Sequence, residues 1–336
     1  DFLSSFEKPA QRDIIWSIHG YLRDAYGSKW YQGVELELEK EEYVLTSDDK
    51  YNGCPVAYAW ALSTINNSKR KVYRDRLMEW ASLVPNEFFK LFLKFSQNND
   101  PQICSDLYSI LVCVIYECSD KELIETVSKW ICSNVLHPDK IGSNRDISIR
   151  YYSIAIIRKA VSIGIFTQKE ANPFLPPYTS TTYNIKLNKE ALSGTRMSGY
   201  SGIDYDLARY VLIDHFEYAF EDYSDKEGGK FFELIKKVAT EQPEYIGITT
   251  EQFILSATYA YILQIGWNKN EFRTHKKNGS ENAFIGVDSS ILATYFPATH
   301  GEKSSVMTVC EKYVWQARNY ISGFLCDRLP FGEENS

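Results

Sequence analysis

The sequence offers three places where a nucleophile or a general base stands next to a polar neighbour. These are Cys310 beside Glu311, His215 beside Asp214, and Ser201 in a glycine-flanked turn. Adjacent residues on a helix point in different directions, so Asp214 and His215 cannot pair through adjacency alone. The turn at Ser201 lacks the glycine spacing of a nucleophile elbow. We therefore predict no catalytic residue in this chain.

Nucleotide-binding and metal-binding patterns are also missing from the sequence. The segment 300–304, His-Gly-Glu-Lys-Ser, lacks the upstream glycine of a phosphate-binding loop, and no Gly-x-Gly-x-x-Gly occurs. Cys113, Cys118, Cys132 and His137 gather in one stretch but without a Cys-x-x-Cys spacing. We predict no metal site and no cofactor in this chain.

Charged residues recur within apolar helical patterns. Arg145, Asp146, Arg150 and Arg158 follow one predicted helix, and a second group consists of Asp204, Asp206 and Arg209. Such residues either pair internally and lock neighbouring helices in register or recognise an acidic patch on a partner. The basic run 69–76 is a solvated helix face or, alternatively, a phosphate-contacting strip.

Hydrophobic periodicity predicts pairs of helices that should position these residues. Apolar residues recur at spacings of three and four from Lys71 to a stop at Pro85, and again from Asn86. Further helices should start at Pro101, after a cap at Asp120, and near residue 146, the last ending at Gly164. Helical hairpins repeating every 30 to 45 residues are typical of HEAT arrays.

The remaining segments complete an all-α prediction, a HEAT-like α-solenoid followed by a C-terminal helical subdomain. Residues 1–70 form an irregular segment packing on the solenoid, with a short strand at 34–39. Residues 71–171 form the repeats, and 172–203 form a linker rich in Pro, Gly, Ser and Thr. Residues 204–336 form the helical subdomain, whose final helix runs from about 302 to 329 with one apolar stripe: Met307, Cys310, Val314, Ala317, Ile321 and Leu325.

Composition narrows the class of protein. The 336 residues carry a net charge of −7, which disfavours direct nucleic-acid binding, and the longest apolar run, 107–116, is too short to span a membrane. Seven cysteines without a pairing pattern suggest reduced thiols and a cytoplasmic location. Aromatic residues make up 15%, which suits either interfaces or packing between helices. Because the chain begins at Asp1 with no leader pattern, we expect a fragment of a longer protein.

Short motifs along nearly the whole chain carry a resemblance to a known family. In order they are Gln11-Arg12-Asp13 with Trp16-Ser17, residues 59–64 (Ala-Trp-Ala-Leu-Ser-Thr), 148–153 (Ser-Ile-Arg-Tyr-Tyr-Ser), 176–180 (Pro-Pro-Tyr-Thr-Ser), 206–211 (Asp-Leu-Ala-Arg-Tyr-Val), 265–267 (Ile-Gly-Trp) and 311–317 (Glu-Lys-Tyr-Val-Trp-Gln-Ala). The chain resembles the C-terminal helical-repeat region of large bacterial P-loop ATPases of the STAND/NACHT-like type, including AVAST-like antiviral defence proteins.

The resemblance implies a sensor region that binds a protein ligand of phage origin and triggers oligomerisation through an NTPase domain absent from this chain. ATP and Mg²⁺ would belong to that missing domain. We expect the binding surface to be organised by five residues: Arg150, Arg209, Trp267, Tyr313 and Trp315. Two alternatives stay open, a structural scaffold of a larger ATPase and an all-α hydrolase built from Ser201 and His300.

Overall fold

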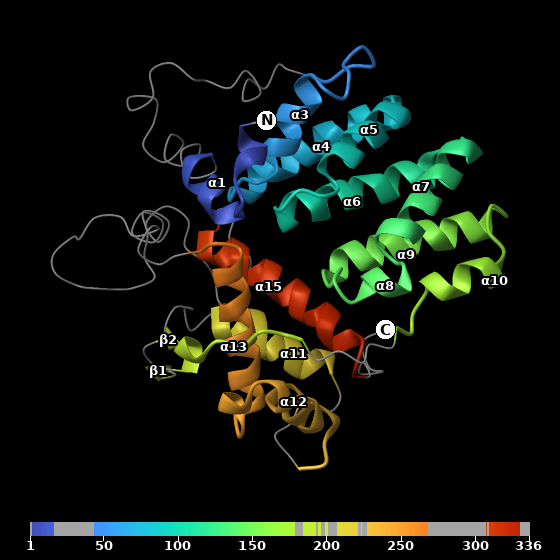
Figure 1. Cartoon of the computed structure of the whole chain (residues 1–336). Helices are drawn as coiled ribbons and strands as arrows, with labels where there is room; N and C mark the ends of the chain where they lie inside the picture. The colour runs from blue at the N-terminus through green and yellow to red at the C-terminus, as the bar shows by residue number, and fades with distance from the viewer. Residues whose placement is uncertain are drawn as a thin grey trace, which may run out of the picture. The chain divides into compact units, whose positions relative to one another are not determined.

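The computed structural model describes residues 2–16, 44–178, 184–192, 194–195, 199–200, 207–220, 223, 227–267, 307 and 309–329. The described part of the chain is mostly helical, at 71%, in agreement with the all-α expectation. The chain divides into two compact units, residues 1–176 and 177–336 (Figure 1). This division falls within the predicted linker. The strand expected at 34–39 lies outside the described residues.

The first unit contains a short 3₁₀ turn, Leu3–Ser5, followed by a series of α-helices. They are α1 (Pro9–Ile15), α3 (Cys54–Ala61), α4 (Asn67–Leu83), α5 (Pro85–Phe95), α6 (Pro101–Glu117), α7 (Lys121–Asn134), α8 (Pro138–Ile141), α9 (Ile147–Ser162) and α10 (Gln168–Ala171), with a last 3₁₀ turn at Asn172–Phe174.

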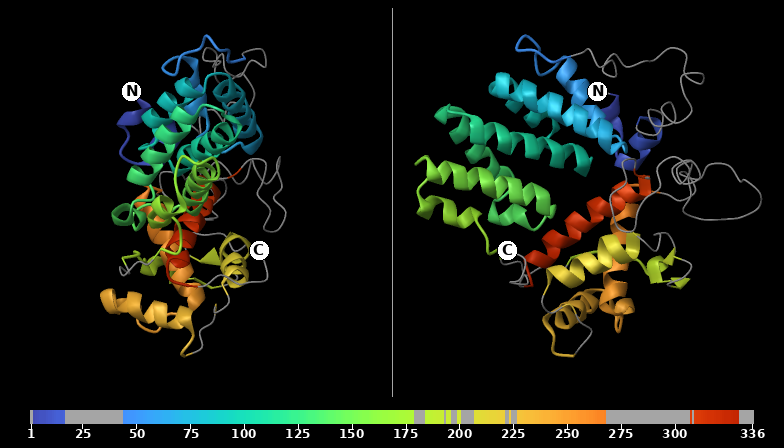
Figure 2. Two further views of the ribbon diagram at one scale, coloured as in Figure 1. Left: turned by 90° about the vertical axis from the view of Figure 1, so that its right-hand side faces the viewer. Right: turned by 180° about the vertical axis from the view of Figure 1, so that it is seen from behind.

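Three helices of this unit, α4, α6 and α9, lie side by side and run in the same direction (Figures 1 and 2). Near the start of α4, Arg70 contacts Asp106 near the start of α6. Near their ends, Ser82 of α4 contacts Glu117 of α6. Helix α5 packs on α4 and α6, and α7 packs on α9. In this unit α4, α6 and α9 therefore form one layer, with α5 and α7 packed against it.

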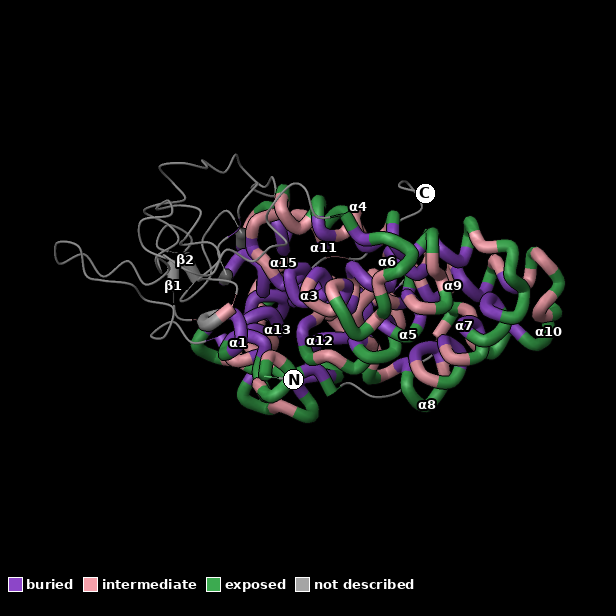
Figure 3. Tube along the Cα trace, turned by 90° about the horizontal axis from the view of Figure 1, so that it is seen from above, coloured by how far each residue is buried: buried purple, intermediate pink, exposed green. Residues whose placement is uncertain are grey.

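Aromatic side chains fill the space between these helices. The ring of Phe92 from α5 meets Tyr108 of α6 edge to face at 4.8 Å and Trp130 of α7 at 5.2 Å. Phe92 and Tyr108 are buried, and buried positions alternate with exposed ones along α5 and α7 (Figure 3). Much of the aromatic content of this unit thus serves packing between helices.

Side-chain caps fix where the helices begin. The carboxylates of Asp100, Asp120 and Asp146 accept backbone N–H bonds at the starts of α6, α7 and α9, and the amide oxygen of Asn66 does so for α4. The predicted cap at Asp120 and the predicted end at Gly164, where φ is +76°, agree with the structure. Because Asn66 caps α4, this helix starts at Asn67 and crosses the domain boundary that we expected at residue 70.

A buried ion pair holds α1 on the unit. The Arg12 guanidinium donates from Nη2 to Asp100 Oδ2 at 3.2 Å and from Nη1 to Asn99 Oδ1 at 2.7 Å. It also lies over the Trp60 ring of α3, 5.0 Å from its centroid. Asn99 in turn donates to the backbone carbonyl of Phe6 at 2.7 Å. The described part of the first 70 residues, expected to be irregular, therefore includes α1, α3 and the start of α4, and this network attaches α1 to the loop before α6.

The second unit begins with the 3₁₀ turn Lys189–Leu192 and a two-residue antiparallel pair, β1 (Gly194–Thr195) and β2 (Gly199–Tyr200). A π-helical turn, Leu207–Ile213, leads directly into α11 (Asp214–Ala219). The chain continues through α12 (Lys230–Glu241), the 3₁₀ turn Pro243–Tyr245, α13 (Thr250–Gln264) and α15 (Val309–Cys326).

Helix α15 packs against α13 and against the π-helical turn, and the predicted apolar stripe of this last helix is buried. The helix is described from Val309, and residues 302–306 of the predicted segment lie outside the described residues. Helix α13 ends as predicted at Gly266, where φ is +96°. There the Trp267 N–H bonds to the carbonyl of Ile262 at 3.0 Å, a Schellman cap.

We predict that Asp100→Ala destabilises the chain far more than Asp120→Ala. Both carboxylates cap a helix through the N–H groups two and three residues later, and Asp120 is exposed. Losing the cap should cost about 1 kcal/mol in each variant. Asp100→Ala also leaves the Arg12 charge buried without its carboxylate, for a total loss of about 3–5 kcal/mol. Urea unfolding followed by circular dichroism measures both, and equal losses would contradict the role of the Arg12 pair.

Candidate functional site

A buried carboxylate on α6 organises the exposed side of the first layer. Asp106 accepts two hydrogen bonds from Arg70 of α4, from Nε at 2.6 Å and from Nη2 at 2.8 Å, and Arg74 Nη1 lies 4.0 Å away. The Asp106 side chain is 4% exposed. A fork-shaped pair of this kind fixes both distance and orientation. It thereby sets the register between α4 and α6.

Tyrosines continue this surface from α6 onto α9. The Tyr116 hydroxyl donates to the carbonyl of Ala155 at 3.4 Å, and the Lys159 ammonium lies over the Tyr116 ring at 5.5 Å. The rings of Tyr151 and Tyr152 meet edge to face at 5.7 Å. Burial raises the pKa of Tyr152, whereas the side chains of Tyr116 and Tyr151 are largely exposed. Exposed tyrosines beside cations are typical of protein-contacting surfaces.

We call this surface the outer face. It consists of the outward-facing side chains of α4, α6 and α9, among them Arg74, Cys113, Tyr116, Tyr151, Arg158 and Lys159. Asp106 lies beneath it. Sequence reasoning did not bring these residues together, although it considered Arg158 and the basic run 69–76, which contains Arg74. A further signal was Asp106, the only charged residue from Pro101 to Tyr116 in an otherwise apolar helix.

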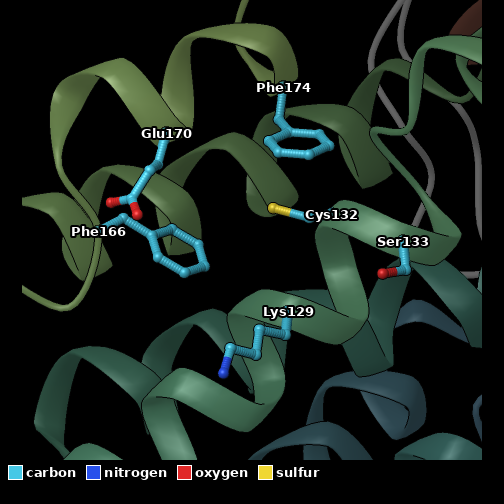
Figure 4. A pocket seen from close by; sticks show the side chains of 6 residues that line it. All are labelled: Lys129, Cys132, Ser133, Phe166, Glu170 and Phe174. Carbon is cyan, nitrogen blue, oxygen red and sulfur yellow. The ribbon is translucent and has the colours of Figure 1, made fainter.

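A groove of about 340 Å³ lies elsewhere in the first unit, between α7 and the segment that follows α9 (Figure 4). Its apolar walls come from Phe166, Phe174 and Cys132, and burial raises the pKa of the Cys132 thiol to about 11. On its rim, the Lys129 ammonium pairs with Glu125 at 2.6 Å, and Glu170 accepts hydrogen bonds from Thr167. Because the thiol is neutral and the charged groups already have partners, the groove is suited to bind an apolar side chain and not to catalyse a reaction.

Arg150, expected on the binding surface, is instead buried at 2% exposure. Its guanidinium donates to the backbone carbonyls of Ile141 and Asn144, in the loop between α8 and α9. Arginine satisfies such carbonyls well because its donors are numerous and fixed in a plane. In this structure Arg150 closes a loop and does not face solvent.

The other four expected binding residues belong to the second unit. Arg209, in the π-helical turn, contacts carboxylate oxygens of Asp214 at 2.8 Å, Glu217 at 3.5 Å and Glu251 at 3.4 Å. These contacts tie the turn to α11 and α13. Asp214 thus pairs with Arg209.

The three aromatic residues predicted to bind are largely covered. Trp267 is 4% exposed and packs edge to face on Tyr259, where it follows the cap of α13. Tyr313 is fully buried in the core of the second unit. Trp315 is partly exposed, and the Arg318 guanidinium lies over its ring at 4.1 Å. Trp267 and Tyr313 therefore serve packing within the second unit, which was the alternative interpretation of the aromatic residues.

The residues considered for catalysis and metal binding show no assembled site in the described part of the chain. Ser201 and His300 lie outside it, as do Asp204 and Asp206. Cys310 is buried on α15. Within the described ranges, no three His, Cys, Asp or Glu side chains form a group that could hold a metal ion, and none of the seven cysteines forms a disulfide.

Comparisons leave the family open. No protein-family model, curated protein or solved structure matches the chain significantly. In the ranges that the structure describes, no helix combines the length and the apolar character needed to cross a membrane.

His215 generates a prediction about pH. Its burial, together with the nearby positive charge of Arg318, lowers the pKa of the imidazole to about 4 from 6.5. The unfolded chain therefore takes up a proton between pH 6.5 and pH 4 that the folded chain takes up only below this range. The contribution of His215 to the free energy of unfolding is therefore fully present above pH 6.5. It is lost as the pH falls toward 4, and the loss is at most about 3 kcal/mol.

His215→Gln should consequently show a shallower loss of stability than the native chain between pH 7 and pH 4.5. Urea unfolding at a series of pH values provides the measurement. Identical pH profiles for the two proteins would show that the folded chain protonates His215 as readily as the unfolded chain does.

Proposed function

We propose that this chain is a non-catalytic protein-recognition region of a bacterial STAND-type ATPase in antiphage defence. In this proposal the first unit is a HEAT-like solenoid that binds a phage protein in the cytoplasm. The nucleotide-binding switch, with its ATP and Mg²⁺, and the effector belong to parts of a longer protein. The order of short motifs along the chain supports the family assignment.

One observation carries the recognition role. Three parallel helices, α4, α6 and α9, present one continuous outer face on which Tyr116 is 50% and Tyr151 is 69% exposed. A stack of hairpins supplies such an extended surface because each hairpin buries its apolar side on its neighbours. Large tyrosine side chains bury much area at small entropic cost when a partner covers them.

Recognition would act by differential binding. A ligand protein that fits one arrangement of the whole protein better than another shifts the population toward that arrangement. The Asp106–Arg70 pair favours a rigid first layer. A rigid layer can pass the effect of ligand binding to the rest of the protein without a change in its own surface. Oligomerisation through the NTPase domain would follow from that shift.

The proposal is tested first by identifying the partner. The purified chain is incubated with lysate from phage-infected and from uninfected bacteria, and captured proteins are identified by mass spectrometry. A single phage protein captured only after infection is then purified, and its affinity is measured by isothermal titration calorimetry. If several phages yield no such protein, the scaffold alternative replaces the proposal.

The exposed tyrosines provide a matched pair of variants. We predict that Tyr151→Ser weakens binding of the captured protein about tenfold, since loss of an aromatic contact residue costs more than 1 kcal/mol. Tyr218→Ser is the control, because Tyr218 is 76% exposed on α11 of the second unit. Its affinity should match that of the native chain. The reverse pattern, weakening only by Tyr218→Ser, would place recognition in the second unit and contradict the assignment to the outer face.

A further inference from the structure

Positive charge is concentrated on one layer of helices in the first unit, although the chain as a whole is negatively charged. The three helices of the outer face, α4, α6 and α9, together carry eight basic and four acidic residues. Of these, Arg150 and Asp106 are buried, which leaves seven basic and three acidic residues, a net charge of +4. The full chain has a net charge of −7. Behind this layer, α5 carries two basic residues and one acidic residue, and α7 carries two of each. Positive potential is therefore concentrated on the face that also exposes tyrosines.

Several of these cations are already engaged. Arg70 is held by Asp106, Lys71 pairs with Asp75 at 2.7 Å, and Arg76 pairs with Glu79 at 3.0 Å. These contacts leave little of the basic run 69–76 to act as a phosphate-contacting strip. They agree with the interpretation of that run as a solvated helix face.

Three other cations have room for a new partner. Arg74 lies 4.0 Å from Asp106, whose two oxygens already accept from Arg70. Lys159 contacts the Tyr116 ring, and in the described part of the chain neither Arg158 nor Lys159 forms an ion pair. Arg158 is exposed on the same ridge of α9 as Tyr151, seven residues earlier.

These groups lie on both sides of α6. Arg74 approaches from α4 and Tyr152 from α9. In addition to burial, the charge of Asp106 raises the pKa of Tyr152 and the charge of Arg74 lowers it, so both charges lie near this side chain. Along α6, Asp106 lies near the start and Tyr116 with Lys159 near the end, ten residues apart and thus about 15 Å along the axis. Arg74 and Lys159 therefore lie at opposite ends of a surface that includes exposed Cys113.

We propose that the outer face binds an acidic segment of the protein partner, with carboxylates at Arg74 and at Arg158 and Lys159, and with apolar side chains over Tyr116 and Tyr151. This inference rests on the proposed function and specifies the chemistry of its ligand. Partner carboxylates would gain charge-assisted hydrogen bonds while the tyrosines lose contact with water.

An acidic protein segment fits this face better than a nucleic acid does. Affinity for nucleic acid comes from neutralising many phosphates, whereas the cations with room for a new partner described above are three, Arg74, Arg158 and Lys159. The exposed Glu117, which accepts from Ser82 at 3.1 Å, would repel a continuous phosphate backbone. A protein segment can instead place its few acidic residues where the cations are.

The test uses a defined probe and the full chain. The probe is a fluorescein-labelled helical peptide of about 15 residues, which spans about 22 Å, with glutamates in its first and last turns and leucines between them. A copy with glutamine in place of each glutamate and a single-stranded DNA oligonucleotide serve as comparison probes. Binding is measured by fluorescence anisotropy at physiological ionic strength.

Matched variants locate the binding site. Arg74→Glu with Lys159→Glu should weaken acidic-peptide binding at least tenfold. Lys94→Glu with Lys121→Glu makes the same change in net charge at exposed positions on α5 and α7, and should change affinity less than twofold. Circular dichroism confirms that both variants fold. Bound peptide should also slow alkylation of Cys113 by iodoacetamide, with Cys54 on α3 as the internal reference.

Four outcomes overturn this inference: no binding of the acidic peptide, equal binding of the glutamine peptide, tighter binding of the DNA, or equal effects of the two double variants. The captured phage protein is titrated against the same variants. If it binds the native chain and both double variants equally well, the acidic-ligand inference fails while the proposed function stands. If no protein is captured at all, the proposed function itself fails.

Discussion

The first unit depends on one buried carboxylate in an apolar helix. Asp106 would be costly to bury alone, and Arg70 offsets that cost with two short hydrogen bonds from the neighbouring helix. Apolar packing by itself allows parallel helices to slide, whereas a bidentate ion pair has one geometry. Helix α6 therefore has a fixed register on α4, and α9 packs on α6 in turn. The spacing of cations and tyrosines on the outer face follows from that register.

Sequence periodicity predicted much of the first unit because its signals are local. The cap Asp120, the first helical proline Pro101, and the stops at Pro85 and Gly164 act within a few residues of the helix ends that they define. The buried stripe of the last helix was predicted for the same reason. The start of α4 was predicted too late because Asn66, whose side chain caps it, carries no apolar periodicity.

The candidate site was much harder to predict, since it depends on which helices become neighbours. Arg150 looked available for binding until the loop before α9 placed two backbone carbonyls against it. Trp267 was expected to help organise the binding surface, but it packs on Tyr259 next to the cap of α13. Conversely, Tyr116 and Lys159 are 43 positions apart in sequence and meet only because α6 and α9 lie side by side. A net charge of −7 likewise concealed a basic face.

A protein partner bound to the outer face of the first unit would protect the backbone of the helices that it covers. Hydrogen–deuterium exchange of the chain, alone and saturated with the captured partner, detects this protection because it reports on every helix at once. We expect slower exchange in the second half of α6 and in α9, with α12 unchanged. Slower exchange confined to the second unit, with α6 and α9 unaffected, would contradict this expectation.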